Sequence, residues 1–116
     1  MYLLDAIGSY PMAGAIPGRS FDAGKLTRFG YLTLTAQRDN LLCRAGESIA
    51  AHEFHRWDAD DPGEAFLAEK PSGRRWPCVH ATGTLYAGYP HFHFYANPVF
   101  AANFLAACRK EKHRHA

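Results

Sequence analysis

The sequence predicts a single α/β domain that consists mostly of strands and ends in one helix. Its 116 residues are 47% hydrophobic and 14% aromatic, which suffices for one core and excludes an intrinsically disordered chain. Runs of alternating bulky and small residues, rich in β-forming types, occupy much of the chain. The one clear helix signal comes near the C-terminal end.

The first third of the chain is expected to hold a helix end, a loop and a strand. The aliphatic residues of Met1–Ile7 share a helical face that Gly8 can cap, which predicts the last turns of a helix. Pro11–Ser20 contains two prolines and two glycines, a composition typical of loops. Phe29–Ala36 alternates bulky and small side chains and is predicted to be a strand.

The middle of the chain is expected to hold several further strands. After a turn at 38–40, Ser48–His55 is predicted to be the second long strand. Trp57–Glu64 contains four acidic residues, a proline and a glycine, which indicates an exposed loop. Shorter strands are predicted at Ala65–Glu69 and Pro77–His80.

An aromatic strand followed by a helix is predicted at the C-terminal end. Thr84–Tyr95 is the most aromatic stretch and is expected to be a strand, irregular at Gly88 and Pro90. Asn97 is a favourable N-cap for the helix, and Pro98 suits its first position. One apolar stripe is expected along that helix, formed by Phe100, Phe104, Ala107 and Cys108, with Cys108 as a small core residue.

Charge and cysteine content exclude several classes of protein. Thirteen Lys and Arg against eleven Asp and Glu give a net charge of +2, too small and too scattered for nucleic-acid binding. The charged stretch Arg109–His115 is expected to be a solvated helix end. No apolar run approaches the roughly 18–20 residues that cross a bilayer. Three cysteines without CxxC spacing and a start without a basic leader favour a reducing cytoplasm.

Two histidine motifs are the candidate sites of chemistry. On a strand, His91 and His93 would share one face, as a general base or a metal pair, while Phe92 and Phe94 anchor the other in the core. Two partly exposed histidines bonded to backbone carbonyls are the alternative. Similarly, Glu53 could orient His55 on one strand face, or these could be an ordinary surface Glu and a tautomer-locked His.

Other candidate residues carry weaker signals. None of the three cysteines follows a strand-to-helix elbow, so none is predicted to be a nucleophile. Four arginines could meet an anionic substrate, although isolated arginines are usually surface groups: Arg19, Arg28, Arg74 and Arg75. The glycines fit neither a Walker nor a dinucleotide-binding pattern.

Several motifs, in the same order along the chain, resemble those of the cobyrinic acid a,c-diamide synthase family. They are YPMAGAIPGR at 10–19, RFGY at 28–31, DNLL at 39–42, HEFH at 52–55, YPHFHF at 89–94, and the NP pair at 97–98. Each motif alone is weak, but together and in this order they span essentially the whole chain and are specific.

The resemblance implies the C-terminal part of that family's glutaminase domain. Residues 1–116 would then be a partial domain of the α/β class I glutamine amidotransferase-like (flavodoxin-like) fold. In the family a Cys nucleophile precedes a segment like Met1–Leu3, and the resemblance identifies His91 as the histidine that activates it. Glu53 and His55 match a motif to which only a site-supporting role is assigned.

The activity implied by the resemblance needs more than this chain. The domain would hydrolyse glutamine, and the released ammonia would amidate two carboxylates of a corrinoid, either cobyrinate or hydrogenobyrinate. ATP and Mg²⁺ are expected in a separate N-terminal synthetase domain, and no cofactor in this chain. Because the chain begins after the expected Cys, and a base without a nucleophile cannot form a thioester, we expect no glutaminase activity from it alone.

Departures from the family pattern lead to further expectations. Pro90 replaces a usual aliphatic residue, and Cys43 stands where glycine is common. A parallel sheet cut at its N-terminal strands would leave unpaired edges. We therefore expect the chain to form a homo-oligomer or to dock with an upstream segment that supplies the missing strands.

Two alternatives from other functional classes remain open. The chain could be a non-catalytic interaction or regulatory module on the same fold. It could also be a small metal-binding β-domain, because four imidazoles could satisfy Zn²⁺: those of His52, His55, His91 and His93.

Overall fold

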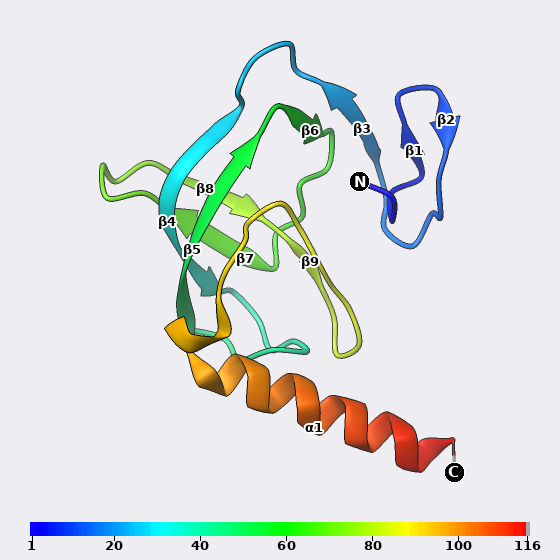
Figure 1. Ribbon diagram of the computed structural model, residues 1–116, viewed down its shortest axis with the longest axis vertical. Coiled ribbons are helices and arrows are strands. Elements are labelled where there is room, and N and C mark those ends of the chain that lie inside the picture. The colour runs from blue at the N-terminus through cyan, green and yellow to red at the C-terminus, as the bar shows by residue number, and fades with distance from the viewer. Residues whose placement is uncertain (116) are drawn as a thin grey trace.

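The computed structural model describes residues 1–115 and consists mostly of strands, with one long helix at its C-terminal end (Figure 1). The elements in chain order are β1 (Ala6–Ile7), β2 (Tyr10–Pro11), β3 (Arg19–Asp22), β4 (Arg28–Ala36), β5 (Ser48–His55), β6 (Trp57–Ala59), β7 (Phe66–Glu69), β8 (Arg75–Cys78), β9 (His80–Ala81), β10 (Tyr86–Ala87), the 3₁₀ turn η1 (Phe94–Ala96) and α1 (Pro98–Arg114).

The strands form three small sheets. The main sheet has the order β5-β4-β7-β8 and is antiparallel throughout. A second sheet has the order β2-β1-β3-β6, in which β1 and β3 form the one parallel strand pair of residues 1–115. β9 and β10 pair with each other. The predicted α/β class, mostly strands with a C-terminal helix, is confirmed, whereas the amidotransferase-like fold stays a prediction.

The core lies on one face of the main sheet. Alternate residues of β4 and β5 point to opposite faces, so one face can be apolar while the other meets water. The buried face carries Leu32, Leu34, Ala36, Ile49 and Ala51, each at most 6% exposed. Phe66 and Ala68 from β7 join this cluster, and Phe100 from α1 closes it.

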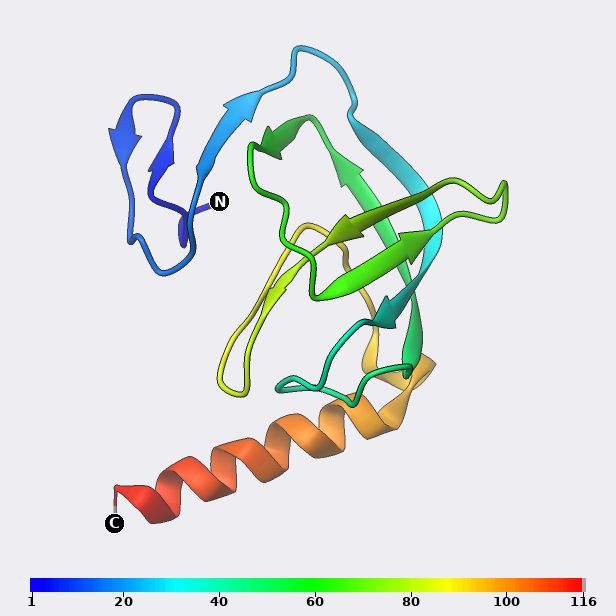
Figure 2. The same cartoon turned by 180° about the vertical axis from the view of Figure 1, so that it is seen from behind.

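The helix is attached to the strands mainly through its first two turns. Asn97 caps it, because its Oδ1 accepts the Val99 N–H at 3.3 Å while its Nδ2 donates to the Ser48 carbonyl at 2.9 Å. Asn103 donates to the Leu42 carbonyl at 2.8 Å. Phe100 is the one fully buried residue of α1. Figure 2 shows the later turns running past the strands towards the C-terminus.

Several predicted elements are confirmed. β4 extends the predicted strand by one residue, to Arg28, and β5 has the predicted bounds Ser48–His55. The helix begins at Pro98 with Asn97 as its N-cap, as predicted. Short strands also lie at or next to the two predicted short segments. No helix of residues 1–115 is both long and apolar enough to cross a membrane.

The predicted helix at Met1–Ile7 is wrong. This segment forms turns followed by β1, and its backbone pairs with later residues: Ile16 N–H donates to the Leu3 carbonyl at 3.0 Å and Gly14 N–H to the Leu4 carbonyl at 2.9 Å. Gly8 has a φ of 57° in the β1–β2 turn, not at a helix end. These non-local backbone bonds override the helical spacing of the aliphatic residues.

The predicted loop at Trp57–Glu64 is wrong at its start, and the predicted strand at Thr84–Tyr95 is wrong over most of its length. Trp57–Ala59 forms β6 because it pairs with β3. In the aromatic stretch only β10 is extended and paired as a strand. Its pairing ends before Gly88, the first of the two predicted irregular residues, and Phe94–Ala96 forms η1.

Along the predicted apolar stripe of the helix, burial is complete only at Phe100, and the predicted core position of Cys108 is wrong. Phe104 is 43% exposed and Cys108 is also exposed. Phe94, expected in the core, is 42% exposed. The helix passes beyond the end of the main sheet, so its later turns have no strand of the described chain to pack against (Figure 1).

Truncation of Phe100 to alanine should therefore destabilise the fold far more than the same change at Phe104. Phe100→Ala removes a fully buried ring that packs at 5.8 Å from Phe92, and should cost about 3–5 kcal/mol of unfolding free energy. Phe104→Ala should cost no more than about 0.5 kcal/mol. Urea denaturation followed by circular dichroism measures both, and equal losses would contradict the observed docking of the helix.

Candidate functional site

The polar end of the buried sheet face carries Glu53 and His55. Both side chains project from β5 to the side of the core, and Glu53 is only 3% exposed. Gly30 stands directly opposite Glu53 in the register of β4 and β5. Because glycine has no side chain, this part of the sheet is not filled by apolar groups. A carboxylate is thus held inside the domain, where an uncompensated charge is costly.

Hydrogen bonds at both ring nitrogens fix His55. Its Nδ1 lies 2.7 Å from the Trp57 carbonyl oxygen, and its Nε2 lies 3.3 Å from Oε2 of Glu53. A carbonyl oxygen only accepts, so Nδ1 carries a proton. The Nε2 atom can then donate to the carboxylate only if the ring is protonated on both nitrogens. The arrangement therefore favours an imidazolium–carboxylate pair.

The pKa of His55 is raised above its usual value of 6.5 by this environment. Burial alone lowers the pKa of the ring, but the hydrogen bond to Glu53, the bond to the Trp57 carbonyl and the nearby negative charge raise it by more. The predicted orienting of His55 by Glu53 on one strand face is thus present in the structure, with Glu53 buried and not at the surface.

Tyr89 covers the His55 ring. The two rings are stacked, with centroids 4.2 Å apart and planes inclined by 13°. The Tyr89 hydroxyl lies 3.3 Å from Oγ of Ser20, which is fully buried and lies 3.1 Å from the Asp58 carbonyl oxygen. Ser20 belongs to β3 of the second sheet. This chain of contacts joins the two sheets across the Glu53–His55 pair.

A cleft of about 210 Å³ lies beside this pair. Arg28 and Trp76 are among its lining residues, with the Arg28 guanidinium 4.6 Å from the centre of the Trp76 ring. Cys78 also lines the cleft, but burial raises its pKa to about 12. Its thiol stays protonated at neutral pH and is a poor nucleophile. The cleft combines a buried carboxylate, a cationic guanidinium and aromatic walls.

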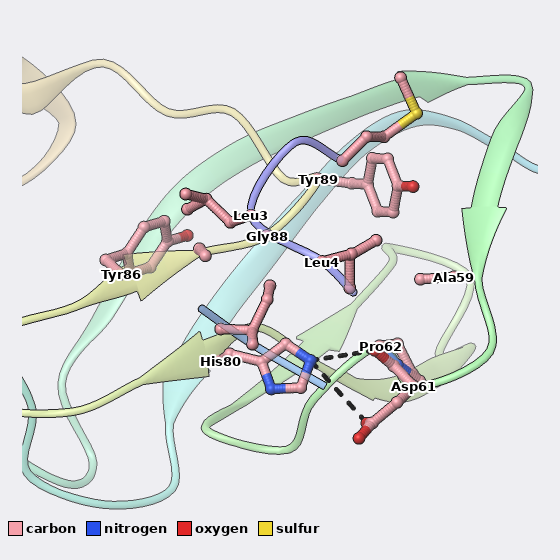
Figure 3. Close-up of a pocket in the computed structure, with 12 residues that line it drawn as sticks. Leu3, Leu4, Ala59, Asp61, Pro62, His80, Tyr86, Gly88 and Tyr89 are labelled. Atoms are coloured by element: carbon pink, nitrogen blue, oxygen red, sulfur yellow. Dashed lines mark hydrogen bonds and ion pairs between the residues drawn. The ribbon is translucent and has the colours of Figure 1, made fainter. Parts of the chain in front are cut away.

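A second cavity of about 220 Å³ shares Tyr89, Ala59 and Pro62 with the first cleft as lining residues (Figure 3). Its walls are mainly apolar and include Leu3, Leu4 and Tyr86, and Figure 3 shows His80 at its edge. Nε2 of His80 lies 2.9 Å from the Asp61 carbonyl oxygen. The sequence assigns no role to His80, or to Tyr89 although that residue begins the YPHFHF motif, because only the tertiary fold brings these two side chains to a cavity.

His91 lies away from Glu53 and His55, on the exposed face of the main sheet. Its backbone forms two hydrogen bonds of 2.8 Å with His52, which make an isolated antiparallel bridge at the free edge of β5. The two imidazole rings are stacked with centroids 5.4 Å apart. Successive residues of a strand point to opposite faces, so the structure unites Glu53 with His55 but separates both from His91.

His93 is exposed and caps the turn η1, where its Nδ1 accepts the Tyr95 N–H at 3.2 Å. Phe92 packs against Tyr86 and Phe100, as expected of a core anchor. Within residues 1–115, no three His, Cys, Asp or Glu side chains are grouped so that they could hold a metal ion. The zinc-binding alternative thus gains no support, since His52 and His55 lie on opposite faces of β5.

Comparison with known proteins confirms the resemblance inferred from the motifs. The chain is similar to cobyrinate a,c-diamide synthases from Salmonella typhimurium (36% identical over 106 residues), Synechococcus sp. (34% over 104) and Thermoplasma acidophilum (34% over 100). These matches cover 87%, 87% and 84% of the chain. The chain spans only about a quarter of these relatives, 23%, 23% and 22%, which fits the expected C-terminal part. No family model and no solved structure matches it.

The Glu53–His55 pair should make stability depend on pH. The pKa of His55 in the folded state lies above its usual value of 6.5. The pair therefore contributes its full stabilisation of the folded state below pH 6.5, and this stabilisation is lost as the pH rises through the folded-state pKa. Replacement of Glu53 by Gln should thus cost about 1–3 kcal/mol more at about pH 5.5 than at about pH 8.5. Urea denaturation at both pH values tests this. Glu69→Gln, at an exposed site in β7, is the matched control and should show no such difference.

Proposed function

We propose that this chain, a homologue of about a quarter of a cobyrinate a,c-diamide synthase, is part of a glutaminase domain that feeds ammonia to corrinoid amidation in the cytoplasm. The observation that carries the proposal is the 36% identity over 106 residues with the Salmonella typhimurium synthase. The similarity covers both histidine motifs of the chain, since it extends over 87% of its length.

His91 is proposed as the general base of glutamine hydrolysis. Its exposed imidazole would take the proton of a cysteine thiol, and the thiolate would attack the carboxamide carbon of glutamine. Collapse of the tetrahedral adduct breaks the carbon–nitrogen bond, releases ammonia and leaves a thioester. Water then cleaves the thioester to glutamate and restores the thiol. The histidine carries the proton in each step.

The thiol in this proposal comes from outside the chain. Cys43 and Cys78 are buried, and burial raises the pKa of both. Cys108 is exposed on α1, beyond the first two turns that attach the helix to the strands. A polypeptide that supplies the nucleophile, whether covalently continuous or separate, is therefore needed, and ATP and Mg²⁺ would act in the synthetase part that uses the ammonia.

Glu53 and His55 support this site from the opposite side of the same strand. They do not touch the reacting atoms in this scheme. The bonds of His55 to Glu53 and to the Trp57 carbonyl fix the end of β5, and β5 in turn holds His91 through the His52 bridge. The buried pair would thereby act as positioning residues for the base.

The chain alone should not hydrolyse glutamine, and activity should appear on complementation. The complementing protein is the Salmonella typhimurium synthase without the part that the chain matches. We expect glutamate release only from the mixture, with a loss of about 10²–10⁴-fold for His91→Ala. His93→Ala is the matched control and should retain activity. Glutamate released by the isolated chain, or equal losses in both variants, would contradict the proposal.

A further inference from the structure

The exposed face of the main sheet carries a row of aromatic side chains. Phe29 and Tyr31 from β4 stand directly opposite Phe54 and His52 of β5, and the bridge from His52 adds His91. We call these five residues the aromatic face. Phe29, Tyr31 and Phe54 are 59%, 81% and 65% exposed. These large rings meet water on the face opposite the core.

Two ring pairs lie within the aromatic face. Phe29 and Phe54 form an edge-to-face pair with centroids 5.6 Å apart, and His52 and His91 form the stacked pair. On the solvated face of an antiparallel sheet these positions are normally polar. A contiguous exposed apolar patch on a soluble domain usually marks an interaction site.

The edge of the same strand is partly open. β5 ends the order of the main sheet, and in residues 1–115 its free side is met by the bridge from His52 to His91 and by the Asn97 side chain on the Ser48 carbonyl. A free strand edge presents backbone donors and acceptors that another polypeptide can pair with. A small molecule or a lipid surface would use the rings but would leave these backbone groups unpaired. The combination favours a polypeptide as the occupant.

We propose that the aromatic face is the docking surface for the polypeptide that carries the cysteine nucleophile. The relatives contain most of their length outside the part that this chain matches, so they hold ample polypeptide to cover this face. This inference rests on the proposed function, because His91 lies within the face and a thiol can reach it only if its carrier covers that face. Docking would bury Tyr31 and Phe54 beside the new site.

Cysteine footprinting can test this. Tyr31→Cys and, as a matched control, Tyr10→Cys are made in a Cys108→Ser background, since Cys43 and Cys78 are buried. Tyr10 is 72% exposed and lies in β2 of the second sheet. A maleimide should modify both new thiols rapidly in the isolated chain. Addition of the Salmonella typhimurium synthase that lacks the matched part should slow modification at position 31 by about tenfold or more, because a buried thiol is shielded, and leave position 10 unchanged.

A chimera provides a second measurement that does not need the truncated synthase to fold alone. In it, this chain replaces the matched part of the full Salmonella typhimurium enzyme, and peptide mass spectrometry reads the modified positions. Equal modification at positions 31 and 10 in both preparations would overturn the inference. Protection of position 31 in the isolated chain, increasing with its own concentration, would also overturn it in favour of a second copy as the occupant.

Glutamine hydrolysis, measured in parallel, separates the two proposals. Protection at position 31 without hydrolysis would retain the docking surface and contradict the glutaminase function. Hydrolysis without protection would retain the function and overturn the docking surface. Phe54→Ala should weaken association by about tenfold or more, because the change removes a central ring of the docking surface. Tyr10→Ala, in β2 of the second sheet, is the matched control and should leave association unchanged.

Discussion

The alternation of β5 is the constraint on which the rest of the structure depends. Side chains of this strand point in turn to the core and to solvent, so Glu53 and His55 lie inside while His52 and Phe54 lie outside. A shift of register by one residue would exchange the two sets and expose the core. The buried polar pair and the aromatic face are therefore two sides of one strand, and neither can be changed independently of the other.

The burial of the Glu53–His55 pair at the end of an apolar sheet face costs desolvation free energy, so the pair is a weak source of stability. Leu32 and Ile49 show that this sheet can bury aliphatic side chains completely, and buried ion pairs are often no more stabilising than such residues. What the pair does provide is orientation, because a charged hydrogen bond and a carbonyl bond hold His55 in one position. The same strand carries His52 and its bridge to His91 on the opposite face, so the position of one side is tied to the position of the other.

The similarity to cobyrinate a,c-diamide synthases and the exposed surfaces of the domain are consistent with each other. The chain matches about a quarter of those enzymes, and it presents exposed rings, a partly open strand edge and a helix whose later turns have little cover. Each of these features is unfavourable for an isolated domain in water and ordinary for a surface that another polypeptide covers. The same surfaces carry the histidine to which the family resemblance assigns the base.

The sequence by itself determined the elements whose signals are local. Alternation over Ser48–His55 specified a strand and placed Glu53 beside His55, and Asn97 with Pro98 specified where the helix begins, since caps act within a few residues. Only the tertiary structure decided what depends on distant partners. It turned Met1–Ile7 into turns and a strand, stacked Tyr89 on His55, and put His91 on the face away from Glu53. Backbone pairing and packing between remote segments leave no periodic trace in a sequence, and they override local preference wherever the two conflict.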